Sequence, residues 1–314
     1  MAQSVEVLDP GILSTVQDLG RRGYQHLGFS VGGASDPRAL ILANHLVGNP
    51  VSSAGVEMTA RGPRLRFSEV TAVAVVGIDP VVLLDGVAAD SAKTLLVGPG
   101  SELAIPSMAG ARSYLAIHGG IDVPLVMGSR STDLLAGFGG LDGRRLERGD
   151  RLPTLGGAAI PGRRRLTPQF ELRQGDRVRV RFCADPRYPQ LQGALAQFIA
   201  QGWEVGPELD RVGLRLVGKE ILGSGDQVLS EGQPAGAIQL PGNGLPIVLL
   251  SARHTVGGYP KLGVVGPMGI CTLAQATPGT KVAFELVESD QLAREARGWL
   301  AALEWPEVCT DGVL

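Results

Sequence analysis

The hexapeptide His-Thr-Val-Gly-Gly-Tyr in the second half of the chain carries the residue types best suited to chemistry. His254 and Thr255 can position or exchange protons. Gly257 and Gly258 allow positive φ angles and a close approach of backbone N–H groups to a ligand, and Tyr259 adds an amphipathic wall. A turn followed by a strand explains the same residues about as well as a ligand pocket does.

A second glycine-rich turn, residues 237–244, lies just before this hexapeptide. Gln239 offers a side-chain amide there, and the turn offers free backbone donors. Two such segments on neighbouring strands favour a shared site.

Three polar residues of the first half also stand out. Asp36 lies at the start of an expected helix, and Asn44 and Glu57 interrupt apolar surroundings. If these groups are buried, they must be paired. Their structural interpretation is a capping aspartate with an internally bonded amide and carboxylate, and their functional interpretation is substrate binding.

The signatures of several enzyme classes are missing from the sequence. It has no phosphate-binding P-loop, no spacing typical of a metal site and no biotinylation motif. Residues 28–32 match the Gly-x-Ser-x-Gly pattern of serine hydrolases, but the helix that must follow Ser30 directly is delayed until after residue 35. A glycine-rich turn before a capped helix explains this segment better.

Charge and cysteine content narrow the function classes further. The 314 residues carry 29 Lys and Arg against 31 Asp and Glu, a net charge of −2. This balance argues against nucleic acid as the main partner. Three scattered cysteines fit reduced thiols rather than a disulfide framework. With no apolar stretch of the roughly 20 residues that a membrane span requires, we expect a cytoplasmic protein.

The pattern of apolar residues predicts a mainly β fold with a few short helices. The 45 glycines and 21 prolines recur between short apolar runs, which is typical of a barrel or sandwich. Helices are expected over residues 35–47, 189–201 and 289–303. The Gly-, Pro- and Arg-rich stretch at 156–168 is the best linker candidate. We therefore predict one half over 1–160, a second over 161–288, and a terminal helix and tail over 289–314.

Several motifs in a fixed order resemble the biotin-dependent carboxyltransferase family, which includes allophanate hydrolase subunit 2 and the C subunit of 5-oxoprolinase. They cover the chain from about residue 5 to residue 287. The main ones are Thr-Val-Gln-Asp-Leu-Gly-Arg at 15–21, Gly-Ala-Ser-Asp at 33–36, Ala-Asn-His-Leu-Val-Gly-Asn at 43–49, Gly-Gly-Ile-Asp-Val-Pro at 119–124, Asp-Arg-Val-Gly-Leu at 210–214, Gly-Ala-Ile-Gln at 236–239 and Thr-Val-Gly-Gly-Tyr-Pro at 255–260.

The resemblance implies a cyclophilin-like β-barrel architecture, here expected as two related barrels. It also implies a partner resembling allophanate hydrolase subunit 1 or the B subunit of 5-oxoprolinase, in a heterotetramer, with a possible third partner like the A subunit of 5-oxoprolinase. The leading interpretation is a subunit of an ATP-dependent 5-oxoprolinase, with ATP bound at the level of the complex. The alternatives are biotin-dependent carboxyl transfer to urea and a non-catalytic partner of a kinase-inhibitor-like protein.

Under this resemblance Arg211, Gln239 and His254 are the expected catalytic residues, and no metal site is expected. The expected substrate-binding residues are Thr255, Gly257, Gly258, Tyr259, Asp36, Asn44 and Glu57. The chain departs from the family where many relatives have Asp-x-Gln-Thr, because Ala252 and His254 stand at the Asp and Gln positions. The departure replaces a carboxylate by a methyl group and a neutral amide by a titratable ring.

Overall fold

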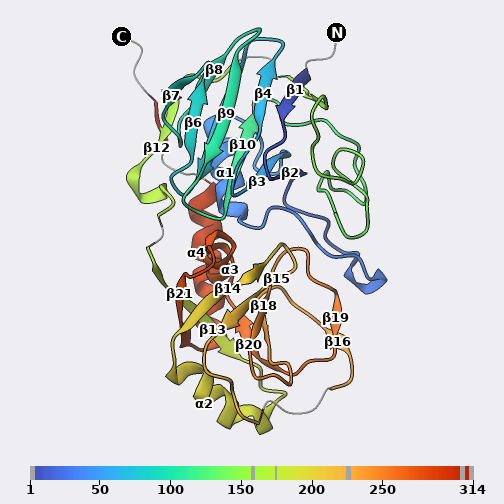
Figure 1. The fold of residues 1–314 in the computed structure, drawn as a ribbon, viewed down its shortest axis with the longest axis vertical. Coiled ribbons are helices and arrows are strands. Elements are labelled where there is room, and N and C mark those ends of the chain that lie inside the picture. Colours follow the sequence, from blue (N-terminus) through green and yellow to red (C-terminus); the bar gives the residue numbers. More distant parts are fainter. Residues whose placement is uncertain (1–3, 157–159, 174, 224–227, 305–307, 311–314) are drawn as a thin grey trace. The chain divides into compact units, whose positions relative to one another are not determined.

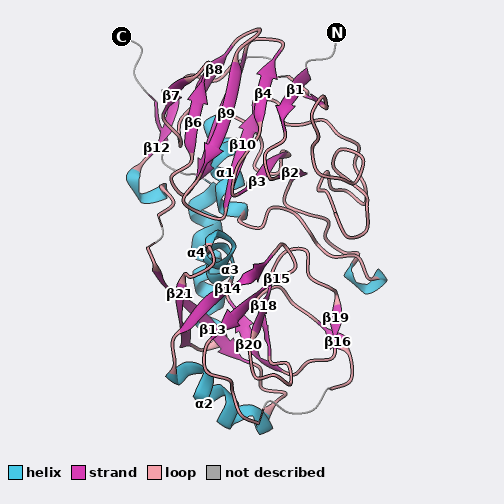
Figure 2. Cartoon of the chain, viewed as in Figure 1, coloured by secondary structure: helices cyan, strands magenta, loops and turns pink. Residues whose placement is uncertain are grey.

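The computed structural model describes residues 4–156, 160–173, 175–223, 228–304 and 308–310. The chain forms two compact units, the first from residues 1–21, 32–173 and 303–314, and the second from residues 22–31 and 174–302. Strands predominate in both units (Figures 1 and 2), which confirms the predicted mainly β class. The predicted domain divisions after residues 160 and 288 stay predictions.

The first unit contains two open β-sheets around one apolar core. In their order across the sheets, the strands are β11 (Arg151–Pro153), β1 (Ser4–Asp9), β4 (Arg64–Phe67), β9 (Glu102–Ser107), β6 (Val81–Leu84) and β7 (Val87–Ala89) in one, and β2 (Leu13–Gln17), β3 (Gly55–Thr59), β10 (Arg112–Ile117), β5 (Thr71–Gly77) and β8 (Leu95–Val97) in the other. A short pair, β12 (Arg164–Leu166) with β22 (Val308–Thr310), is also present.

Helix α1 (Pro37–Leu46) packs on β10 and β5. It begins where the sequence predicts, because the Asp36 side chain accepts a hydrogen bond from the Arg38 N–H and Pro37 occupies the first turn. With the helix on one face and the core on the other, β10 is buried along its whole length. This explains why its residues do not alternate between apolar and polar.

The second unit is built on a closed seven-stranded barrel. Around the barrel the strands are β13 (Arg177–Ala184), β20 (Lys261–Val265), β17 (Ala237–Gln239), β18 (Ile247–Leu249), β15 (Gly213–Val217), β14 (Trp203–Leu209) and β21 (Lys281–Leu286). Only β13 and β21, among these strand pairs, run parallel. The barrel architecture therefore belongs to the second half, whereas the strands described in the first unit form open sheets instead of a second barrel.

The remaining elements are helices, one short strand pair and 3-10 turns, of which the turn at Pro168–Phe170 belongs to the first unit. Helices α2 (Gln192–Ala200) and α4 (Ser289–Glu304) confirm two predicted helices, and α3 (Pro267–Gln275) was not predicted. Short elements are the strand pair β16 (Glu231–Gly232) and β19 (Val256–Gly257), and the 3-10 turns η1 (Gln25–Leu27), η2 (Pro168–Phe170) and η3 (Pro189–Leu191). No described helix is both long and apolar enough to cross a membrane.

The predicted linker at 156–168 is only partly irregular. Residues 157–159 lie outside the described part, whereas residues 164–166 form β12. Arg164 donates a hydrogen bond from its guanidinium to the His45 carbonyl at 2.7 Å. One arginine of this stretch therefore contacts the end of α1.

Acidification should destabilise the first unit through Asp150. Arg144 donates two hydrogen bonds to this carboxylate, at 2.7 and 2.8 Å, and holds its pKa below the ordinary value of 3.8. A carboxyl whose pKa is lower in the folded state contributes stability that is complete above its unfolded pKa and is lost as the pH falls through the folded pKa.

The unfolding temperature, measured by calorimetry, should therefore fall as the pH drops below about 5 and continue to fall until the pH passes the lowered pKa of Asp150. In Asp150→Asn the fall should be shallower. An identical pH dependence in the variant would contradict this role for Asp150.

Candidate functional site

A cavity of about 540 Å³ opens on the outer face of the barrel. Alternation along the strands produces it: Leu214 and Val248 point into the barrel core, so their neighbours point outward. The lining residues come from β14, β15, β17, β18 and the loop after β18. They are Pro207, Glu208, Leu209, Asp210, Val212, Gly213, Arg215, Gln239, Ile247, Leu249 and His254.

Two of the three predicted catalytic residues line this cavity. Gln239 is 7% exposed and comes from the end of β17, and His254 is exposed and comes from the loop that follows β18. Asp210 shapes the opposite turn, because its carboxylate accepts hydrogen bonds from the Val212 and Gly213 N–H groups at 2.7 and 3.0 Å. The apolar lining with a few convergent polar groups is typical of a small-molecule site.

Arg211, the third predicted catalytic residue, is buried beside the cavity and is not among its lining residues. Its carbonyl accepts a hydrogen bond from the Ala252 N–H at 2.9 Å. The Leu250 N–H similarly donates to the Val212 carbonyl at 2.8 Å. The turn that carries Arg211 and the loop that carries His254 are thus joined through their backbones.

The predicted binding residues at 255–259 lie around the β16–β19 pair next to the cavity. The Thr255 carbonyl accepts from the Gln233 N–H at 2.9 Å, and the Gly258 carbonyl accepts from the Val228 N–H at 2.9 Å. Tyr259 is 37% exposed. None of these residues lines the cavity itself.

The expected use of positive φ at Gly257 and Gly258 is wrong, because neither glycine adopts it. Gly257 is instead required by close packing. A Cβ added there would lie 2.9 Å from Gln239 Nε2 and 3.2 Å from Gln233 Nε2. The missing side chain therefore lets the β16–β19 pair rest directly on two side-chain amides.

An ion pair between a buried lysine and a partly buried glutamate holds the β16–β19 pair against the barrel. Lys261 on β20 is fully buried, and its ammonium group lies 2.7 Å from Glu231 Oε1 and donates to the Gly232 carbonyl at 3.1 Å. The Tyr188 hydroxyl also donates to Glu231, at 2.6 Å. Burial raises the pKa of Glu231, but the hydrogen bonds from Lys261 and Tyr188 outweigh it, and the net direction is downward.

Burial and the Glu231 charge together raise the pKa of Tyr188 to about 12. The Tyr188 hydroxyl therefore keeps its proton at neutral pH and remains a donor. Its role here is to complete the hydrogen bonding of the carboxylate under the β16–β19 pair.

Arg253 and Gln233 form a second buried polar contact under the same strand pair. Arg253 Nε donates to the Gln233 carbonyl at 2.8 Å, and the Gln233 amide nitrogen donates to the Gly257 carbonyl at 3.1 Å. Gln233 Oε1 is buried and has no hydrogen-bond partner among the described residues. Burial lowers the pKa of the Arg253 guanidinium.

The first-unit candidates are held in networks of their own. The Asn44 amide donates to the Ser53 carbonyl at 2.9 Å and accepts from Asn49 at 3.0 Å. Glu57 accepts from the Tyr114 hydroxyl at 2.7 Å. Asp36 pairs with Arg38 at 3.0 Å. These contacts agree with the interpretation of Asp36 as a capping residue and of Asn44 and Glu57 as internally bonded groups. Substrate binding by the three residues stays a prediction.

The Gly-x-Ser-x-Gly segment lacks the geometry of a nucleophile elbow. A 3-10 turn, Gln25–Leu27, precedes Ser30 in place of a strand, and α1 begins only at Pro37. A strand leading directly into a helix is what exposes such a serine. The interpretation of this segment as a turn agrees with the structure.

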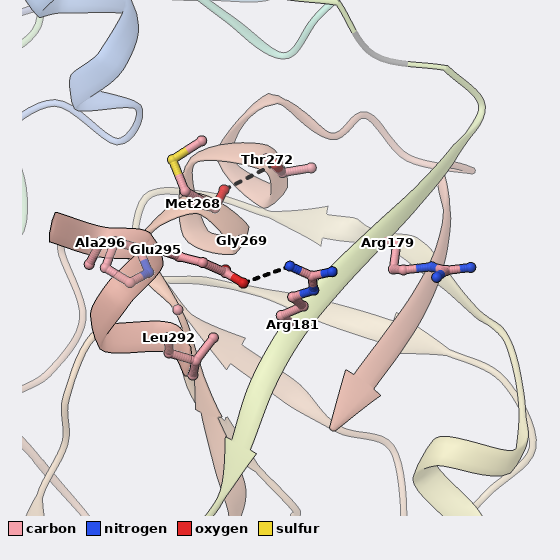
Figure 3. A pocket seen from close by; sticks show the side chains of 10 residues that line it. Arg179, Arg181, Met268, Gly269, Thr272, Leu292, Glu295 and Ala296 are labelled. Atoms are coloured by element: carbon pink, nitrogen blue, oxygen red, sulfur yellow. Dashed lines mark hydrogen bonds and ion pairs between the residues drawn. The ribbon is translucent and has the colours of Figure 1, made fainter. Parts of the chain in front are cut away.

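A smaller cavity of about 280 Å³ lies between β13, the start of α3 and α4. Figure 3 shows its charged side chains. Arg181 donates to Glu295 at 2.6 Å, and Arg179 is largely exposed. Thr272 bonds back to the Met268 carbonyl within α3 at 3.0 Å. Arg181 is paired and Arg179 is largely solvated, so neither arginine of this cavity needs a ligand to offset its charge. Among the described residues there is no cluster of His, Cys, Asp or Glu that could hold a metal ion.

Comparison with known proteins shows which family the sequence matches. The family model described as the carboxyltransferase domain, subdomains A and B, matches residues 27–286. The chain belongs to this family. All residues that line the outer-face cavity lie within the matched range.

Relatives of this carboxyltransferase family differ in length. The C subunit of 5-oxoprolinase from Escherichia coli is 34% identical over 96% of this chain and 98% of its own length. The urea amidolyase of Lachancea kluyveri is 32% identical over 93% of this chain. The matched part is 17% of the length of that protein. The crystal structure of the K. lactis urea amidolyase superimposes with a TM-score of 0.84 at 27% identity, over 96% of this chain and 20% of that one.

Sequence reasoning missed Gln233, Arg253, Glu231 and Lys261. Glu231, Gln233 and Arg253 lie in irregular or very short elements, and Lys261 is the first residue of β20, so no periodicity marks these polar residues as buried. Arg253 lies directly before His254, and Lys261 directly follows the Tyr-Pro pair. Only the strand pair that covers them reveals their burial.

Proposed function

We propose that this chain is a subunit of an ATP-dependent 5-oxoprolinase, which opens the lactam of 5-oxo-L-proline to give L-glutamate. The similarity to the C subunit of the E. coli 5-oxoprolinase carries this proposal, because it extends over 98% of that protein. The urea amidolyases match over less than a fifth of their length.

The chemistry explains why several subunits take part. A lactam is a resonance-stabilised amide, so water attacks it slowly unless the carbonyl is activated. Phosphorylation of the carbonyl oxygen by ATP supplies that activation. Because the sequence has no P-loop, we assign ATP to a site completed by a partner.

We assign the lactam to the outer-face cavity. Gln239 lines it and can donate a hydrogen bond to the lactam oxygen, where negative charge develops when that oxygen, after phosphorylation by ATP, leaves with the phosphate as water attacks the carbonyl carbon. His254 lines it as well and can transfer a proton to the departing ring nitrogen. Arg211 holds Gln239 and His254 in position from the adjacent turn. Thr255, Gly257, Gly258 and Tyr259 form the wall of the substrate site on the side of the β16–β19 pair.

The partners follow from the same proposal. We expect a protein like the B subunit of 5-oxoprolinase, which forms a heterotetramer with this chain, together with a protein like the A subunit, in the cytoplasm. The E. coli and Haemophilus influenzae relatives are themselves named as the C subunits of 5-oxoprolinases, which implies companion proteins.

Reconstitution of the three subunits tests the proposal. The complete mixture should release glutamate from 5-oxoproline in an ATP-dependent reaction, and the mixture without this chain should not. Full activity without this chain would overturn the proposal.

Within the active mixture, Gln239→Ala should lower kcat about 100-fold, as expected for the loss of one donor to a developing negative charge. His254→Ala should lower it by about 100-fold or more. Arg179→Gln is the matched control, because its side chain is 75% exposed and lies outside the outer-face cavity. Unchanged kcat in Gln239→Ala would contradict the assigned role.

The second candidate function is carboxyl transfer from carboxybiotin to urea, favoured by the similarity to two urea amidolyases. It predicts urea- and bicarbonate-dependent ATP hydrolysis with a biotinylated partner and no glutamate release. A non-catalytic regulator is the third outcome, in which the chain binds its partner but Gln239→Ala and His254→Ala change nothing.

A further inference from the structure

Arg253 is a buried cation whose charge is not offset. Only 5% of its surface is exposed, and one hydrogen bond, from Nε to the Gln233 carbonyl, is its only polar contact with the described residues. Burial alone lowers the pKa of its guanidinium, and no carboxylate acts against that effect. Buried charges in proteins are normally paired, because desolvating them costs several kcal/mol.

The neighbouring buried cation shows the usual arrangement. Lys261 is fully buried, and Glu231 lies 2.7 Å from its ammonium group. Arg187 in turn pairs with Asp185 and Glu231. Glu231 and Asp185 are therefore already engaged by Lys261 and Arg187, and Arg253 has no ion-pair partner among the described residues.

The free end of Arg253 remains accessible. Its Nη1 and Nη2 atoms have no hydrogen-bond partner among the described residues. Both atoms keep some exposure to solvent. The Gln233 carbonyl fixes the guanidinium through Nε and leaves the pair of terminal nitrogens to meet a ligand. A guanidinium edge of this kind binds a carboxylate through two parallel hydrogen bonds.

Arg253 is also joined to the outer-face cavity. It directly precedes His254, which lines the cavity. Its partner Gln233 packs on Gly257 together with Gln239, another polar side chain that lines the cavity. The unpaired cation and the two proposed reaction residues thus belong to one continuous set of contacts.

We propose that Arg253 binds the carboxylate of the substrate and makes this site selective for anionic over neutral amides. The inference rests on the proposed function and extends it: 5-oxoproline has a carboxylate for Arg253 and a neutral lactam for Gln239 and His254. Urea has no group that would offset the buried charge. The structure therefore favours the lactam acid over urea.

Two substrates that differ only in the carboxylate test this inference: 5-oxo-L-proline and 2-pyrrolidinone. In the reconstituted complex we expect kcat/KM for 5-oxoproline to exceed that for 2-pyrrolidinone by at least about 100-fold, the contribution of a charge-assisted bidentate contact. Arg253→Gln should reduce this ratio to about 10-fold or less, mainly through KM for 5-oxoproline, and should leave the rate with 2-pyrrolidinone unchanged. Arg253→Lys should retain an intermediate ratio.

The stability of Arg253→Met separates a binding role from a structural one. Removing an unpaired buried charge should leave the unfolding temperature equal to or above that of the wild type. A large fall in unfolding temperature, or an equal loss of activity with both substrates in Arg253→Gln, would overturn the inference. An unchanged preference for 5-oxoproline in that variant would overturn it as well. Arg179→Gln again serves as the control.

Binding measured without ATP separates this inference from the proposed function. If the wild-type complex converts neither substrate, the proposed function fails, and titration calorimetry of the complex with 5-oxoproline and 2-pyrrolidinone decides the inference. Binding of 5-oxoproline that Arg253→Gln abolishes would support the carboxylate site. Equal binding of both compounds, or of neither, would overturn it.

Discussion

Replacing Glu231 by glutamine should lower the free energy of unfolding of the second unit by about 3–5 kcal/mol, the cost of leaving the buried charge of Lys261 uncompensated. The ammonium group of Lys261 is fully buried and has Glu231 as its ion-pair partner at 2.7 Å. Once that carboxylate is neutral, the Lys261 charge remains desolvated and unpaired. Urea-induced unfolding followed by tryptophan fluorescence measures the loss, since Trp203 lies in the barrel core.

The double variant Glu231→Gln with Lys261→Met is the matched control. Removing both charges removes the desolvation cost together with the attraction, so most of the lost stability should return, to within about 1–2 kcal/mol of the wild type. If the double variant is as unstable as the sum of the two single variants, the two residues act independently, and this account of the β16–β19 attachment is wrong.

Replacing Asp18 by alanine should lower the free energy of unfolding of the first unit by about 3–4 kcal/mol. Its carboxylate is almost fully buried and accepts hydrogen bonds from the hydroxyls of Ser129 and Ser131, at 2.7 and 2.6 Å. It also accepts from the N–H groups of Arg130 and Gly20, at 2.6 and 2.8 Å. The variant leaves four donors without their acceptor, and buried donors without partners cost more than the bonds contribute.

Asp122→Ala is the comparison for this variant. Asp122 pairs with Arg130 at 2.9 Å, but its side chain is 43% exposed. An ion pair at the surface contributes little, so its loss should change the free energy of unfolding by less than about 1 kcal/mol. Calorimetry of both variants measures the difference. Equal destabilisation would show that burial of the Asp18 carboxylate is not what makes it important.

Local signals were sufficient for several elements of the fold. The cap and proline before α1 place its start within a residue of the prediction, and the amphipathic pattern of α4 places that helix. Helix α3 was missed because it begins with Gly-Pro and carries a further glycine at 269, which are typical of loops.

The candidate site was predictable only in part. Glycine-rich turns indicated Gln239 and His254, and both line the same cavity. The same reasoning assigned positive φ to Gly257, whereas the structure uses that glycine for close contact with two amides. A sequence pattern identifies a glycine, but it does not distinguish a backbone requirement from a packing requirement.

The mainly β class, the positions of three helices and the resemblance to a family could all be predicted from the residues alone, because caps, turn residues and motifs act over a few neighbouring positions. Tertiary contacts were needed to show that one half closes into a barrel, whereas the strands described in the other form open sheets. They were needed as well to show that Lys261 is paired, whereas Arg253 has no acidic partner among the described residues. Closure of the barrel and burial of these two side chains depend on which strands, distant in the sequence, pair with and cover each other. The electrostatic cost that points to a carboxylate ligand arises only once the β16–β19 pair has removed Arg253 from water.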